Sequence, residues 1–178
     1  MKKALYFLFI VVSLSACSGN NYENEIAEIK EMQQTLSAIK TSYDKIDIKK
    51  VEVATETYKT NMSQIKTYYS PDSIPKKVAG IIDFYKGIKK CNKKFQNTYA
   101  TFNSNLNLVD NQLSTLLLDL ENGAHHPDSV KKYLEAERNN LDVVREECGI
   151  LVDNYTTIVS IHDSLSIKVQ NILLESVE

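Results

Sequence analysis

The sequence is poor in the residues that interrupt helices. Its 178 residues include only 5 glycines and 3 prolines, and it has no tryptophan. Proline and glycine are the strongest local breaks in regular structure, so a long chain that holds few of them favours long helices. This scarcity therefore predicts a fold made of a few extended helical segments.

The motifs of common catalytic frameworks are also missing. The sequence holds no Gly-x-Ser-x-Gly turn for a nucleophilic serine and no Gly-x-x-x-x-Gly-Lys loop for phosphates. A di-iron site in a helical bundle needs a glutamate three residues before each histidine, but the residues at that position are Asn122, Gly123 and Val159. We therefore expect a protein that is not an enzyme and has no catalytic residue and no cofactor.

Two adjacent histidines, His125 and His126, lie near Asp119, Glu121 and Asp128. Adjacent side chains cannot easily direct both rings at one ion, whereas a metal site needs convergent ligands. We expect a polar turn here and no metal site.

The charge is nearly balanced. Lys and Arg together number 21 and Asp and Glu 23, which gives a net charge of −2 at pH 7. Domains that bind nucleic acid usually show a marked basic excess. We expect no nucleic-acid partner, and the composition leaves the oligomeric state open.

The chain begins with a basic and then an apolar stretch. Met1, Lys2 and Lys3 are followed by ALYFLFIVVSL, residues 4–14. A helix of this length reaches about 16 Å, roughly half of a bilayer core, so it is too short for a transmembrane anchor. A basic start, a short apolar run and small residues after it are typical of a secretory signal.

The end of this stretch, Leu14-Ser15-Ala16-Cys17, resembles the lipobox of bacterial lipoproteins. The resemblance covers only residues 1–17, but the order of the residues, their spacing and the flanking sequence all match that signal. It implies that residues 1–16 are removed as a signal peptide and that Cys17 receives lipid. Each buried methylene contributes about 0.8 kcal/mol, so two or three acyl chains anchor firmly. The alternative is an ordinary signal peptide in which the cysteine falls there by chance.

The same resemblance implies a place in the cell envelope. Residues 17–22 would form a short tether, and residues 23–178 a single helical domain. Ser18 stands where some lipoproteins of the inner membrane carry aspartate, so the outer membrane is favoured over the inner one. The face of the membrane stays open. In the rest of its length the chain looks like small helical envelope lipoproteins of no assigned activity, a likeness of architecture that assigns no role to any residue.

Two breaks divide the remaining chain into segments of similar length. YYSPDSIP covers residues 68–75 and ENGAHHPDS covers residues 121–129. Gly123 suits a left-handed helix end, and Pro127 and Asp128 suit a helix start. The three predicted segments are about 22–68, 75–122 and 128–177.

The second and third segments carry sustained heptads, which predict long helices with coiled-coil-like seams. In the second, the seam positions are Val78, Ile81, Tyr85, Ile88, Asn92, Phe95, Tyr99, Phe102, Leu106, Val109, Leu113, Leu116 and Leu120. In the third, they are Val130, Leu134, Glu137, Leu141, Val144, Cys148, Leu151, Tyr155, Ile158, His162, Leu165, Val169, Ile172 and Ser176.

The short connection makes these two helices antiparallel neighbours. With the turn centred near residue 125, Leu120 faces Val130, Phe102 faces Cys148, and Ile81 faces Val169. A helical hairpin is the strongest structural prediction.

The first segment is less regular. Between its two apolar stripes the residues DKIDIKKVEV are rich in charge and β-branched side chains. We expect a kink or break near 44–49, with Asp47 as a cap for a new helix, and rank a short strand at 46–53 lower. The fold class is all-α, an elongated antiparallel three-helix bundle of roughly 70 Å. A fourth helix, formed if this segment folds back, is the alternative.

Four polar or reactive residues lie on or near the seams. Cys91 lies eleven residues from Phe102, the partner of Cys148, about 16 Å along the helix. A disulfide needs Cα atoms within about 7 Å, so we expect two free thiols, with Cys148 buried. His162 is expected to be a core polar residue that bonds Asn92 or Tyr155, with a pH switch or a ligand site as the alternative. Glu137 is expected to reach water at an edge.

Lysines cluster on the second segment at Lys86, Lys89, Lys90, Lys93 and Lys94, and the only acid between Lys76 and Val109 is Asp83. A solvated helix face is the simpler interpretation, and contact with an anionic surface or partner is the functional one.

The function that these features favour is that of a non-catalytic structural or protein-interaction module, held on the membrane through Cys17 and in contact with an envelope protein. With the bundle upright, Tyr68 and Tyr69 would form a distal tip that contacts the partner. The alternative is a ligand-binding module for an anionic or small-molecule partner, built on the lysine face or near His162 and Asn92.

Overall fold

The computed structural model describes residues 22–69, 74–124 and 126–175. Five helices follow one another: α1 (Glu23–Tyr43), α2 (Ile48–Tyr68), α3 (Lys76–Tyr85), α4 (Gly87–Glu121) and α5 (Pro127–Glu175). No strand occurs in these ranges. The all-α prediction is confirmed, and the lower-ranked strand at 46–53 is wrong because residues 48–53 form the start of α2.

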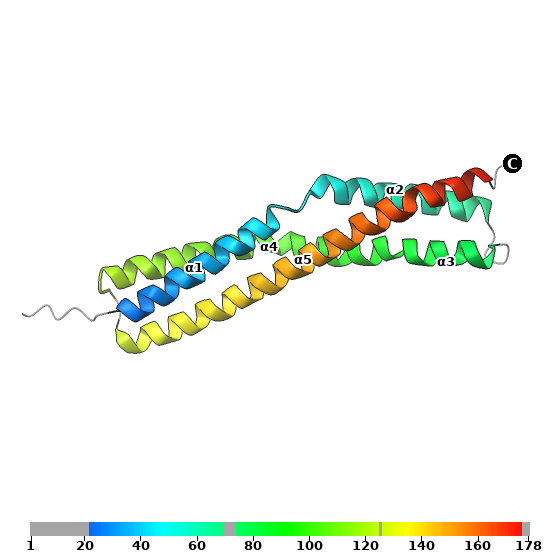
Figure 1. Cartoon of the computed structure of the whole chain (residues 1–178). Helices are drawn as coiled ribbons and strands as arrows, with labels where there is room; N and C mark the ends of the chain where they lie inside the picture. Colours follow the sequence, from blue (N-terminus) through cyan, green and yellow to red (C-terminus); the bar gives the residue numbers. More distant parts are fainter. Residues whose placement is uncertain (1–21, 70–73, 125, 176–178) are drawn as a thin grey trace, which may run out of the picture.

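The molecule is an elongated rod (Figure 1). Its 49-residue helix α5 runs the whole length, roughly 70 Å at the usual helical rise. Helix α4 lies antiparallel to α5, and α1 packs on both in the half that holds the α4–α5 connection. Helix α2 packs on α4 and α5 in the other half, where α3 also contacts α5. The three segments expected from the sequence thus contain five helices.

The predicted break near 44–49 is confirmed. Helix α1 ends at Tyr43, and Asp47 caps α2 by accepting a hydrogen bond from the Lys50 backbone N–H at 3.3 Å. After the break, α2 continues along the rod in the direction of α1 (Figure 1). The alternative in which the first segment folds back on itself is therefore wrong.

A second break, which the heptad does not predict, separates α3 from α4 at Lys86. Gly87 follows it at a point of close approach to α5, since a Cβ atom there would stand 2.8 Å from Ile161 Cδ1. A larger residue at 87 would therefore require the tip of the Ile161 side chain to move.

The hydrophobic core follows the predicted seams. On α4 the buried seam residues are Ile88, Phe95, Phe102, Leu106, Val109, Leu113, Leu116 and Leu120. On α5 they include Val130, Leu134, Leu141, Val144, Cys148, Leu151, Ile158 and Val169. Asn105 Nδ2 on α4 donates to both carboxylate oxygens of Glu147 on α5, at 3.0 and 3.1 Å. This contact agrees with the predicted register, which places Phe102 opposite Cys148.

Helix α4 ends in the conformation that Gly123 predicts. Gly123 has φ +65°, its N–H bonds the Leu120 carbonyl, and the Ala124 N–H bonds the Asp119 carbonyl. These two bonds form a Schellman motif, which requires a left-handed residue at Gly123.

We predict opposite effects for alanine at two glycines. Gly123→Ala should lower the free energy of unfolding by about 1 kcal/mol, because an L-residue is strained at positive φ. Gly149→Ala should raise it by about 0.5–1 kcal/mol, because Gly149 lies inside α5 with open space where an added Cβ atom would lie. Urea unfolding followed by circular dichroism measures both, and the same sign for the two variants would contradict the described helix end.

Candidate functional site

The structure divides the five lysines that the sequence grouped. Lys86 Nζ pairs with Asp83 Oδ1 at 2.8 Å on the helix surface. Lys89 and Lys93 line a groove between α2 and α4 with a volume of about 530 Å³. The remaining two, Lys90 and Lys94, are exposed on α4 outside the lining of this groove.

Helix α2 supplies two further lysines to the same groove, Lys59 and Lys66. Along α2 the lining residues recur every three or four positions, so they share one helix face. The sequence reasoning missed Lys59 and Lys66. Their spacing of one heptad was a usable signal, but only the fold shows that this face of α2 lies against Lys89 and Lys93.

Positive charge in the groove is only partly neutralised. Lys59 Nζ pairs with Glu56 at 3.2 Å, and both side chains are well exposed. Lys66, Lys89 and Lys93 form no ion pair with any residue in the described ranges. No carboxylate is among the described residues that line the groove. The local field therefore favours an anion.

Neutral hydrogen-bonding groups lie among these lysines. Within the part of the chain that the structure describes, Thr55 Oγ1 is buried and has no hydrogen-bond partner. Asn92 also lines the groove, and its Oδ1 accepts a hydrogen bond from Gln96 Nε2 at 3.4 Å. A buried hydroxyl without a partner costs free energy, so Thr55 is a group that a bound molecule could satisfy.

The tyrosine beneath the groove is held in place by aromatic packing. Tyr58 lies 5.3 Å from the ring of Tyr85, and Asn61 Nδ2 donates to the Tyr85 hydroxyl at 3.1 Å. Burial raises the pKa of Tyr58, while nearby Lys86 lowers it. Tyr58 is therefore a neutral, apolar surface.

His162 departs from its expected place. It is half-buried and lines a small depression between α2 and α5, with Lys49 and Lys50 across from it. Its Nδ1 lies 3.1 Å from Asp163 Oδ1. The expected bond to Asn92 or Tyr155 is wrong, because Ile161 is the residue that packs against Gly87 and the next side chain falls at the edge of the seam.

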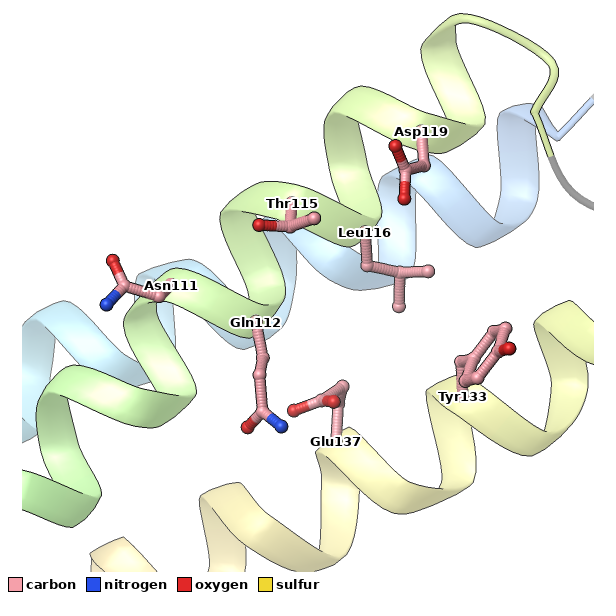
Figure 2. A pocket seen from close by; sticks show the side chains of 7 residues that line it. All are labelled: Asn111, Gln112, Thr115, Leu116, Asp119, Tyr133 and Glu137. Carbon is pink, nitrogen blue, oxygen red and sulfur yellow. The ribbon is translucent and has the colours of Figure 1, made fainter.

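Glu137 also departs from expectation, because it is buried with 7% of its surface exposed. It lines a pocket of about 330 Å³ between α4 and α5, where its side chain points toward Gln112 (Figure 2). Tyr133 and Leu116 flank it in the same pocket. The expectation that it reaches water at an edge is wrong, because these neighbours cover it.

Burial raises the pKa of Glu137, and a hydrogen bond from Asn140 Nδ2 at 3.4 Å opposes that change. Gln112 Oε1 is buried and lacks a hydrogen-bond partner among the described residues. A proton on Glu137 would suit both groups, since a protonated carboxyl can donate whereas a carboxylate cannot.

The two described thiols are unpaired, and Cys148 is buried as predicted. Cys148 Sγ lies 3.7 Å from the Ile39 carbonyl oxygen, and burial raises the pKa of its thiol. A protonated, buried thiol of this kind is a small apolar core residue.

The two tip tyrosines have different surroundings. Tyr68 is 50% exposed at the end of α2, whereas the Tyr69 hydroxyl folds back to donate to the Ile172 carbonyl at 3.4 Å. Phe84 on α3 is 71% exposed in the same half of the rod, and the sequence reasoning missed it. Its position off the seam, between Ile81 and Tyr85, was a usable signal of exposure.

Cys17 and His125 lie outside the described residues. His126 Nδ1 accepts the Asp128 backbone N–H at 3.4 Å, and no cluster of described His, Cys, Asp and Glu residues is placed to hold a metal ion. Among the helices α1–α5, none combines the length and the apolar character needed to cross a membrane. Comparison with protein-family models, with curated proteins and with solved structures finds no match for this chain.

We predict that Glu137→Gln raises the free energy of unfolding at about pH 7. Because the pKa of Glu137 is raised above 4.5 in the folded state, wild-type stability falls as the pH rises from about 4.5 through the raised pKa. Glutamine does not titrate, so the difference from wild type should shrink as the pH is lowered below about 4.5. Urea unfolding at a series of pH values measures this, with Glu146→Gln on the same helix as the control for an exposed carboxylate. A destabilised Glu137→Gln protein at neutral pH would contradict the prediction.

Proposed function

We propose that this protein is a lipid-anchored lipoprotein of the cell envelope with a non-catalytic structural or protein-interaction role. The observation that supports this best is the position of α1 relative to the lipobox. Only residues 18–22 separate Cys17 from α1, and α1 begins at the end of the rod that also holds the α4–α5 connection. Lipid on Cys17 would hold this end close to a membrane.

We infer that the rod behaves mechanically as one three-helix bundle. Helices α1 and α2 form the first path, α3 and α4 the second, and α5 the third. Because α5 is continuous, neither break allows one half to move freely against the other. Such a rod can keep its far end at a fixed distance of up to roughly 70 Å from the anchored end.

The far end supplies the surface for an envelope protein partner. Tyr68 at the end of α2 and Leu174 near the end of α5 expose large side chains there, and Phe84 exposes an aromatic side chain on α3 in the same half of the rod. Aromatic side chains often contribute most of the binding free energy of an interface. We propose the outer membrane as the site of anchoring, on the ground that Ser18 follows Cys17.

Binding of an anion is the second candidate function. The groove between α2 and α4 favours it, because three of the lysines that line it form no ion pair with any described residue.

We predict that the chain carries acyl groups on Cys17 and that the mature protein begins there. Mass spectrometry of the membrane fraction should show acyl mass on the N-terminal peptide, and metabolically supplied palmitate should label the protein. Cys17→Ala should abolish the label, whereas Cys91→Ala should retain it. A mature chain that begins at Met1 and carries no acyl mass on Cys17 would contradict the proposal.

We predict that the far end contacts a protein in the envelope. A photo-crosslinking residue at Phe84 or Tyr68 should capture the same envelope protein in living cells. Leu118, which is 58% exposed near the other end, provides the control position. Equal capture of that protein from Leu118 and Phe84, or none from the far end, would argue against a tip-mediated contact.

A further inference from the structure

We propose that the groove between α2 and α4 binds a phosphate-bearing molecule that also has a small apolar part. This proposal specifies the ligand of the second candidate function, anion binding, and it rests on that function. It does not depend on lipid at Cys17.

The charge of the groove is the first argument. Lys66 from α2 and Lys89 and Lys93 from α4 line it, and none of them pairs with a carboxylate of the described residues. Like charges one turn apart on a helix repel one another, so the pair Lys89 and Lys93 costs stability until an anion enters. A solvated helix face would not need lysines from two helices around one cavity.

The number of charges points to phosphate. A phosphate monoester carries about two negative charges near neutral pH and three acceptor oxygens, whereas a carboxylate carries one charge and two oxygens. Lysine binds phosphate as a point charge, and Lys89 and Lys93 lie one turn apart on the same face of α4, so their ammonium groups can contact different oxygens of one phosphate. The hydroxyl groups of Thr55 and Ser63 add neutral donors in the same lining.

The burial of Thr55 supports a bound molecule. Its Oγ1 atom is inaccessible and has no hydrogen-bond partner in the described structure, although it lines the groove. An unsatisfied buried hydroxyl is uncommon, and a rotation of the Thr55 side chain about χ1 would turn it toward an acceptor oxygen in the groove.

The apolar part is inferred from the size and floor of the groove. Its volume of about 530 Å³ lies in the range of small-molecule sites, roughly 300–1,000 Å³, and exceeds what a phosphate ion fills. Tyr58 and Met62 line it between the lysines, and the Tyr58 ring is fixed against Tyr85. A ring or short alkyl group attached to the phosphate would cover these two side chains.

Helix α4 offers a matched pair of double variants for the test. Lys89→Gln with Lys93→Gln removes two charges from the groove, and Lys90→Gln with Lys94→Gln removes two charges from the same helix outside it. The full chain is purified in a non-ionic detergent, and both variants are checked for unchanged thermal unfolding. Phenyl phosphate, inorganic phosphate and benzoate are titrated calorimetrically at constant ionic strength.

Phenyl phosphate should bind saturably and more tightly than inorganic phosphate or benzoate. The groove variant should weaken this binding about tenfold or more, and the control variant less than about twofold, because direct charge-assisted contacts outweigh screened surface charge. Thr55→Val, which removes only the hydroxyl, should also weaken it. Vesicles that contain phosphatidic acid test whether a lipid headgroup is the source of the phosphate, again with the two lysine variants compared.

The possible outcomes distinguish a failure of the phosphate proposal from a failure of anion binding itself. Equal binding of benzoate and phenyl phosphate would overturn the choice of phosphate and leave anion binding in place. Absence of saturable binding for every probe would overturn both. Equal losses in the two lysine variants would show general surface electrostatics and remove the groove as the site.

Discussion

The packing of α4 against α5 is the interaction on which the rest of the rod depends. Their seams bury Phe95, Phe102 and Leu113 on one side and Leu151 and Ile158 on the other. Helices α1, α2 and α3 all pack on α5, and no contact of comparable extent joins α1 to α2. The long helix therefore serves as the common support, and most of its stability comes from burying this one apolar stripe rather than from intrinsic helix propensity.

Local patterns predicted a large part of this fold. Four features depend on residues that are close in sequence, which is why they could be predicted from it. They are the heptad positions of the two seams, the break after Tyr43, the Asp47 cap and the turn at Gly123. The break at Lys86 could not be found in this way, because the seam continues across it. The sequence predicted only part of the candidate site. Lys89 and Lys93 belong to a cluster of lysines that is evident in the sequence, whereas Lys66 joins the lining of the groove only because α2 packs against α4.

Buried and partly buried polar groups fix the register of the apolar seams. Asn61 bonds Tyr85 between α2 and α3, and Asn105 bonds Glu147 between α4 and α5. A slip along either helix pair would leave these groups without partners, at a cost larger than the gain from the bonds themselves. Surface ion pairs such as Lys40 with Asp110 add little by comparison, because both side chains remain in contact with water.

The position of the groove limits where its ligand could come from. Lys93 lies 28 residues before Glu121, the end of α4 beside the start of α1, which corresponds to about 42 Å of helix. If lipid on Cys17 holds the start of α1 at a membrane and the rod stands upright, the groove lies several Debye lengths, each about 8–10 Å, from that surface. The field of the anchoring membrane would then not reach the lysines. An upright rod therefore favours a freely diffusing phosphate ester over a headgroup of its own membrane, whereas a rod lying flat would bring the same groove within reach of lipid.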